Sequence, residues 1–260
     1  MTLAVSLQAV ALIGPGLPDW AAARAVLAGE QAYAHAPTVV PAPTLLPPNE
    51  RRRSSLAVRI ALAVGAGARP ADGIATVFAS SSGDVDTCHA ICEQLAGEDR
   101  LISPTRFHNS VHNAPSGYWS IATRDMRAST SLCAFDGSFA AGLLEAGALV
   151  RAGGAPVLLV VYDAPYPEPL RAKRPVTDAF GLALRLAPPE PGGALATLSI
   201  AATGARPDAL DAPALESMRR AIPAARALPL LGRLARRESG TAVIDYLEGL
   251  ALEVAVAPCA

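Results

Sequence analysis

The stretch ASTSLCAFDGSFAAGLLEAG, residues 128–147, decides the fold that we expect for this chain. Its first part, residues 128–134, suits a β-strand, and residues 137–150 form the clearest helical pattern in the sequence. A strand that turns into a helix can expose a nucleophile and aim backbone N–H groups at an oxyanion. Cys133 lies at this junction, so it is the first residue to consider for chemistry.

Strands and helices alternate on both sides of the junction. Upstream we expect a strand over residues 3–13, a second over 74–80, and helices over 20–30, within 50–68 and over 86–96. Downstream, PVLLVVYDA at 156–164 has no alternation of polar and apolar residues, which predicts a strand buried on both faces. The alternation up to residue 164 therefore predicts a largely parallel sheet with helices on both faces.

The remaining segments are less regular. We expect residues 101–113 to form a polar loop that carries histidines, followed by a helix that begins near Pro115. Beyond residue 165 we expect strands over 178–186 and 194–202, helical segments within 213–236, a helix over 241–249 and a last strand over 250–257. We divide the chain into a main domain, 1–204, and an extension, 205–260, that completes or caps the same domain.

Composition limits the function classes. The formal net charge of this 260-residue chain is −1, with no long run of one sign, which argues against nucleic-acid binding. The basic run Arg51-Arg52-Arg53 is read as a solvated helix start. The apolar N-terminus has no basic residue before it and is broken at Gly14-Pro15-Gly16, so we expect no signal peptide, no membrane insertion and a cytoplasmic protein.

The four cysteines do not suggest a disulfide framework in a chain of this size. Cys88 and Cys92, together with His108 and His112, offer ligand types that zinc prefers. Their spacing fits a zinc site poorly, so buried structural cysteines and loop histidines are the favoured reading, and no metal or cofactor is expected.

An ordered set of segments carries a family resemblance. PTRFHNSVHNAPSGYWSIAT at 104–123, with Pro104, Asn113 and Gly117, and the stretch at 128–147 resemble the N-terminal half of β-ketoacyl synthases. QAVALIGPGL, LPPNERRRSSLAVRIALAVG and TVFASSSGD resemble its earlier segments. This likeness implies an α/β, thiolase-like layered fold with a mixed sheet, truncated in its second half. More narrowly, the chain resembles the short ketosynthase-like subunits of bacterial aryl polyene gene clusters, which pair with a complete ketosynthase in the manner of a chain-length factor.

Departures from the family decide the expected function. Matching the helix end, Gly142 to Ala146, places the family's nucleophile position at Asp136, whereas a shift of three residues would place it at Cys133. The family also needs histidines in its second half, and this chain has none after His112. The resemblance therefore implies a subunit without condensing activity. An acyl-transfer enzyme that uses Cys133, with His108 or His112 as its base, stays open as the alternative.

The same resemblance implies a partner. In the family, the strand before the nucleophile pairs antiparallel with its counterpart across a two-fold axis, and each subunit helps to wall its neighbour's acyl tunnel. We thus expect a heterodimer with a full-length ketosynthase, which an acyl carrier protein would reach through that partner. The expected interface and tunnel residues are Ser129, Thr130, Ser131, Leu132, Cys133, Ala134, Phe135 and Phe139; the two phenylalanines could also be ordinary core residues.

Overall fold

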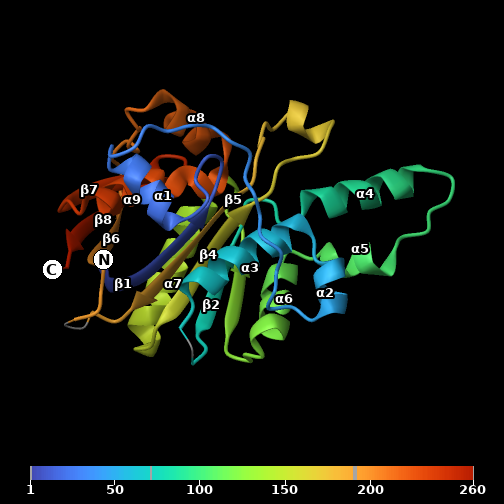
Figure 1. Ribbon diagram of the computed structural model, residues 1–260, viewed down its shortest axis with the longest axis horizontal. Coiled ribbons are helices and arrows are strands. Elements are labelled where there is room, and N and C mark those ends of the chain that lie inside the picture. Colours follow the sequence, from blue (N-terminus) through green and yellow to red (C-terminus); the bar gives the residue numbers. More distant parts are fainter. Residues whose placement is uncertain (1, 71, 190–191, 260) are drawn as a thin grey trace.

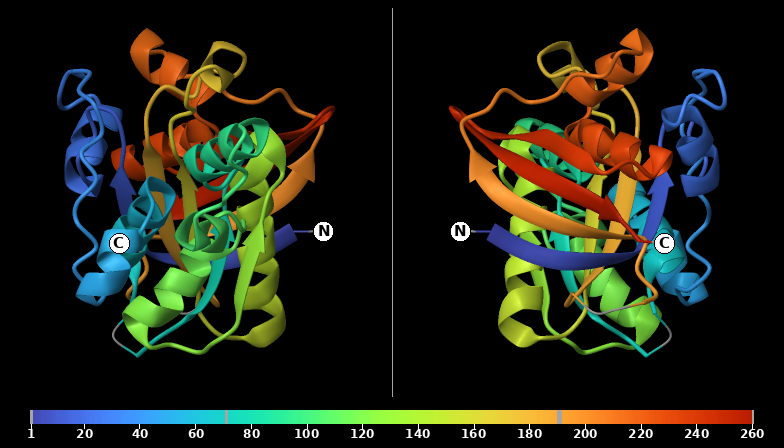
Figure 2. Two further views of the ribbon diagram at one scale, coloured as in Figure 1. Left: turned by 90° about the vertical axis from the view of Figure 1, so that its right-hand side faces the viewer. Right: turned by 90° about the vertical axis from the view of Figure 1, so that its left-hand side faces the viewer.

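A computed structural model describes residues 2–70, 72–189 and 192–259. Their strands form one mixed sheet in the order β3-β2-β4-β5-β1-β6-β8-β7 (Figure 1). The strands are β1 (Thr2–Ile13), β2 (Ala75–Ala79), β3 (Ser129–Leu132), β4 (Val157–Asp163), β5 (Phe180–Ala187), β6 (Ala196–Thr203), β7 (Gly240–Leu247) and β8 (Leu250–Pro258). The sheet twists so strongly that the orange and red strands β6, β8 and β7 run steeply across the direction of β2 and β4 (Figure 2).

Helices connect and cover these strands. They are α1 (Trp20–Leu27), α2 (Pro48–Arg53), α3 (Leu56–Ala68), α4 (Val85–Ala96), α5 (Pro104–Asn109), α6 (Ala114–Thr123), α7 (Ser138–Gly153), α8 (Pro213–Ala221) and α9 (Leu228–Arg236), with the 3₁₀ turns η1 (Phe135–Gly137), η2 (Leu170–Ala172) and η3 (Pro223–Ala227). Within the described ranges, none of these helices combines the length and the apolar character that crossing a membrane requires.

Both faces of the sheet are covered, as the sequence predicts. Val157, Leu159 and Val161 of β4 pack in the core that includes the α7 face. The alternate residues Leu158, Val160 and Tyr162 pack in a second core together with residues of α3. Strand β4 is therefore buried on both faces, which explains why its sequence shows no alternation.

The sheet is parallel only at one end. β2 pairs parallel with β3 and with β4, whereas every other strand pairing is antiparallel. The expectation of a largely parallel sheet is thus wrong beyond these three strands. Helical connections lead from β2 to β3, its parallel neighbour, and from β3 past β2 to β4 on its other side, while β7 turns directly into β8. The sequence pattern cannot reveal that β1 lies between β5 and β6.

Three local expectations are also wrong. Residues 241–249 form most of β7 and its turn and not a helix. Ala242 and Ile244 are buried and Val243 between them is only partly buried, which is the period of two that a strand has. The 101–113 loop contains the short helix α5, which Pro104 begins. The three arginines at 51–53 end α2 and do not start a helix; Ser55 then caps α3 by accepting a hydrogen bond from the Val58 N–H, 3.4 Å.

The two edges of the sheet differ. At the β7 edge, the Asp208 N–H donates to the Val243 carbonyl (2.9 Å) and the Asp208 carboxylate accepts from the Val243 N–H (3.0 Å). One loop residue thus satisfies the N–H and C=O groups of Val243, in the middle of β7, that a further strand would use. At the β3 edge, no described segment pairs with the outer side of the strand. An unpaired edge is a template for another chain, so β3 is the edge that is open to pairing.

Replacing Asp208 with alanine is expected to unmask the β7 edge. The variant leaves the Val243 N–H without its acceptor, which should lower the free energy of unfolding by about 1 kcal/mol and increase self-association. Denaturant unfolding and light scattering would measure the two effects. The exposed Asp211→Ala variant, in the same loop, is the matched control. If Asp208→Ala behaves like this control in both assays, Asp208 does not protect the edge.

Candidate functional site

The junction between β3 and α7 is held by its own backbone and by Ser138. Cys133 and Ala134 follow the strand, η1 comes next, and α7 begins at Ser138. The Ser138 hydroxyl accepts from the Ala134 N–H (3.0 Å) and donates to the Phe135 carbonyl (2.7 Å). Gly137 lies so close to β7 that a Cβ there would stand 2.1 Å from the Tyr246 carbonyl oxygen, so only glycine fits.

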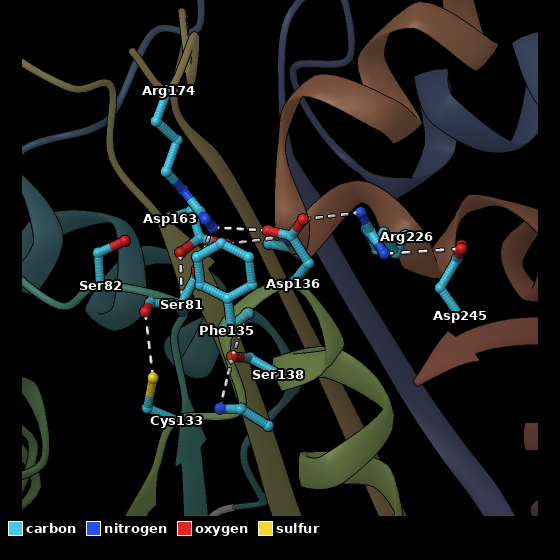
Figure 3. A network of polar contacts seen from close by, with 12 residues as sticks. Ser81, Ser82, Cys133, Phe135, Asp136, Ser138, Asp163, Arg174, Arg226 and Asp245 are labelled. Carbon is cyan, nitrogen blue, oxygen red and sulfur yellow. Dashed lines mark hydrogen bonds and ion pairs between the residues drawn. The ribbon is translucent and has the colours of Figure 1, made fainter. Parts of the chain in front are cut away.

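Asp136 is clamped between two arginines (Figure 3). Arg174 donates to one carboxylate oxygen at 2.6 Å, and Arg226 donates to the other at 3.0 Å. Arg226 also forms an ion pair with Asp245 (3.5 Å), which in turn is bound by Arg219. Charge-assisted hydrogen bonds of this kind occupy the acceptor lone pairs of a carboxylate. A carboxylate held in this way is a poor acceptor for an acyl group.

A second carboxylate, Asp163, lies fully buried at the end of β4. It accepts hydrogen bonds from the Ser81 N–H (2.9 Å), the Ala224 N–H (2.8 Å) and the Ser80 hydroxyl (3.2 Å). Burial nevertheless raises the pKa of Asp163 from 3.8 to about 7, because desolvation of the charged form outweighs these donors and the attraction of Arg174. Through these hydrogen bonds Asp163 joins the end of β4 to the turn after β2 and to η3 in the interior of the protein.

Ser81 connects the two carboxylates. Its backbone N–H binds Asp163, and its hydroxyl accepts from Arg174 at 2.6 Å. We call Ser81, Asp136, Asp163, Arg174 and Arg226 the junction network. They come from five separate segments: the turn after β2, η1, the end of β4, the loop before β5, and η3. The network thus fixes the junction against the body of the protein.

Cys133 is exposed and contacts this network through the backbone of Ser81. Its thiol donates to the Ser81 carbonyl at 3.1 Å, and the His112 ring nitrogen lies 3.2 Å from the neighbouring Ser80 carbonyl. In the described part of the chain, no hydrogen bond joins this thiol to a histidine. A catalytic cysteine needs an adjacent base, and among the described residues no histidine is hydrogen-bonded to Cys133.

The residues considered as zinc ligands lie apart in the chain's elements: Cys88 and Cys92 in α4, His108 in α5 and His112 in the turn after it. Among the described residues, no group of three or more histidine, cysteine, aspartate or glutamate side chains is placed to hold a metal ion. Cys88 and Cys92 are exposed on α4, so the expectation that the cysteines are buried is wrong; α4 contains no buried residue. His108, in α5, packs edge-on against the ring of Tyr118 in α6, with ring centroids 6.1 Å apart.

The remaining residues singled out in the sequence lie in β3, at the junction with α7, and at the start of α6. Ser129, Thr130, Ser131 and Leu132 form the edge strand β3. Phe135 is 65% exposed at the junction, whereas Phe139 is fully buried in the core beneath it. Asn113 precedes α6, where its carbonyl accepts from the Ser116 hydroxyl and the Gly117 N–H. A Cβ at Gly117 would meet nothing within 4 Å, so close packing does not require glycine there.

Arg174, Arg226 and Asp163 were not found from the sequence. Asp163 had a detectable signal, since a carboxylate at the end of an all-apolar strand is costly unless it is hydrogen-bonded. Arg174 follows a proline-rich loop and Arg226 lies in a helical stretch with many arginines, so neither stands out. Arg174 and Arg226 bind Asp136 from positions 38 and 90 residues away in sequence, so only the folded chain brings them together.

The sequence matches the family profile described as the β-ketoacyl synthase N-terminal domain over residues 20–241. The chain belongs to this family. The resemblance that the segments around residues 104–123 and 128–147 suggested is therefore confirmed. No curated protein matches the sequence.

Solved structures confirm the thiolase-like ketosynthase fold. A chain in the complex of a ketosynthase with its chain length factor from Xenorhabdus doucetiae is 25% identical, with a TM-score of 0.75, and the match covers 97% of this chain and 99% of that one. A chain in a type II polyketide synthase complex of a ketosynthase with its acyl-carrier protein is 10% identical (TM-score 0.75; 98% and 99% covered). A β-ketoacyl synthase from Burkholderia phymatum is 13% identical (TM-score 0.54), and the match covers 92% of this chain but 71% of that one.

Proposed function

We propose that this chain is a non-catalytic, chain-length-factor-like subunit that forms a heterodimer with a complete β-ketoacyl synthase and shapes its acyl tunnel. The observation that carries the proposal is the near-complete match, in both directions, to a chain of the ketosynthase–chain length factor complex. The match to the Burkholderia synthase covers 71% of that chain, a smaller share than the 99% of the chain in the ketosynthase–chain length factor complex.

The open β3 edge supports a partner at this side of the molecule. Antiparallel pairing of β3 with the equivalent strand of a ketosynthase would continue the sheet through both subunits. Exposed large apolar side chains also occur in the segments that precede and follow β3 in sequence: Phe107, Ile121, Met126 and Phe135. Phe135 would line the partner's tunnel directly, whereas the buried Phe139 would support it from within the core.

The chemistry at the junction supports a non-catalytic role. If Asp136 occupies the family's nucleophile position, its carboxylate is already bound by two arginines. If Cys133 occupies it instead, no described histidine is hydrogen-bonded to the thiol, and no histidine follows His112 in the sequence. In either alignment the condensation would be carried out by the partner, to which an acyl carrier protein would deliver the chain.

The pathway and the role of residues 205–260 belong to the same proposal. We place the heterodimer in the cytoplasmic synthesis of a fatty-acid-like or aryl polyene chain, following the narrower resemblance. Residues 205–260 would complete the single domain, since β7 and β8 extend the sheet beyond β6 and Arg226 of η3 reaches the junction.

Co-expression tests the proposal. The tagged chain is expected to co-purify in a 1:1 ratio with the full-length ketosynthase encoded nearest its own gene. Acyl groups from a loaded carrier protein should appear on the ketosynthase alone, and Cys133→Ser should change nothing. Failure to co-purify, together with normal elongation by the ketosynthase alone, would contradict the heterodimer. An acyl adduct on Cys133 that is lost in Cys133→Ser would favour the alternative enzyme.

A further inference from the structure

Phe135 combines exposure with an unfavourable backbone conformation. Its ring is 65% exposed, and its backbone φ is +51°, in the left-handed region that bulky residues rarely adopt. Because the Phe135 ring is mostly exposed, burial does not hold it in one orientation. Contacts from other parts of the chain must therefore fix it.

Arg174 supplies those contacts. Its guanidinium carbon lies 3.8 Å from the centre of the Phe135 ring, and 5.7 Å from the centre of the Tyr166 ring. The same guanidinium donates to the Ser81 hydroxyl and to the Asp136 carboxylate, each at 2.6 Å. A planar guanidinium can stack on a ring and form hydrogen bonds in its own plane at the same time, which an ammonium group cannot do.

The anchors of Arg174 are themselves fixed. Ser81 is buried, and its N–H is bound to the buried Asp163 carboxylate; the second oxygen of Asp136 is bound to Arg226. Figure 3 shows Arg174 descending onto the Phe135 ring between these groups. The orientation of the Phe135 ring thus depends, through Arg174, on groups that β4 and η3 hold in place.

We propose that Arg174 is a positioning residue that fixes the Phe135 ring at the junction between β3 and α7 and thereby sets the length of the acyl chain that the ketosynthase partner makes. This inference rests on the proposed function. A ring held in one orientation gives the tunnel a defined end and one dominant chain length. A ring released from Arg174 would take several orientations, and the tunnel would then end at several depths.

Two substitutions at Arg174 separate positioning from stability. Arg174→Lys keeps a positive charge near Asp136 and Ser81 but loses the stacked plane, and Arg174→Gln loses both. Arg171→Gln is the control, because Arg171 lies in η2 of the same connection between β4 and β5, is exposed and, within the described part of the chain, its side chain pairs with Glu168 alone, at 2.8 Å. Phe135→Ala removes the ring itself.

The experiment compares product lengths by mass spectrometry for each variant co-purified with the ketosynthase and supplied with malonyl-loaded carrier protein. Arg174→Lys and Arg174→Gln are expected to lower the ratio of the main product to the next length by about two- to fivefold, the factor that a cation–π contact at a partly exposed site provides. Phe135→Ala should shift the products toward longer chains, and Arg171→Gln should match the wild type.

The outcomes distinguish the two levels of the proposal. A wild-type product pattern from both Arg174→Lys and Arg174→Gln, with a shifted pattern from Phe135→Ala, would overturn the positioning role and leave the tunnel role intact. If Arg174→Gln does not fold, Arg174→Lys decides the question alone. If the ketosynthase makes the same lengths without this chain, the proposed function itself fails.

Discussion

Ser131→Pro is expected to weaken the proposed heterodimer with a ketosynthase by about 10- to 100-fold in affinity while leaving the chain folded. In a parallel strand pair, alternate residues direct their backbone groups to the neighbour. The Ala128 and Leu132 carbonyls accept from Thr76 and Ser80 on the β2 side. The N–H of Ser131 therefore points outward, where proline removes a donor that only a partner strand would use.

Ser131→Ala is the matched control for this prediction. It removes the hydroxyl, which donates to the Ser116 hydroxyl at 3.3 Å, but keeps the outward N–H. Affinity for the ketosynthase can be measured by biolayer interferometry, and folding by thermal unfolding of the isolated chain. Equal affinities for Ser131→Pro and Ser131→Ala, at unchanged thermal stability, would show that the partner does not pair with β3.

Asp163→Asn is expected to change how stability depends on pH. Because the folded pKa of about 7 lies above the ordinary value of 3.8, the folded protein holds this proton more tightly than the unfolded chain. Wild-type stability from this group is therefore fully present below pH 4 and is lost as the pH rises toward 7. The total loss is on the order of 4 kcal/mol, and the uncharged asparagine should abolish it.

Denaturant unfolding between pH 4.5 and 8 would measure this effect. The free energy of unfolding of Asp163→Asn, relative to the wild type, should increase with pH across this window. Glu216, whose pKa is lowered to about 2 mainly by Arg219, contributes equally to both proteins and cancels in the difference. The exposed Asp211→Asn variant should run parallel to the wild type. A parallel curve for Asp163→Asn as well would mean that Asp163 is ionised throughout.

Much of the fold was predictable because its signals are local. β4 and α7 were read correctly, since an unbroken apolar run and a helical repeat depend on neighbouring residues alone. β7 was misread as a helix, because its eight residues form a strand through pairing with β8. The antiparallel pairings of β1 were also hidden, since its partners β5 and β6 lie more than 160 residues away in sequence.

By itself the sequence determined the family, the strand–turn–helix junction at residues 128–147 and the lack of histidine after His112. Only the tertiary structure decided that β3 lies at an open edge, that β7 is capped by Asp208, and that Asp136 is held by Arg174 and Arg226. The reason is physical. Helical and strand patterns report interactions between residues a few positions apart, whereas an edge or an ion pair exists only after distant segments have packed together.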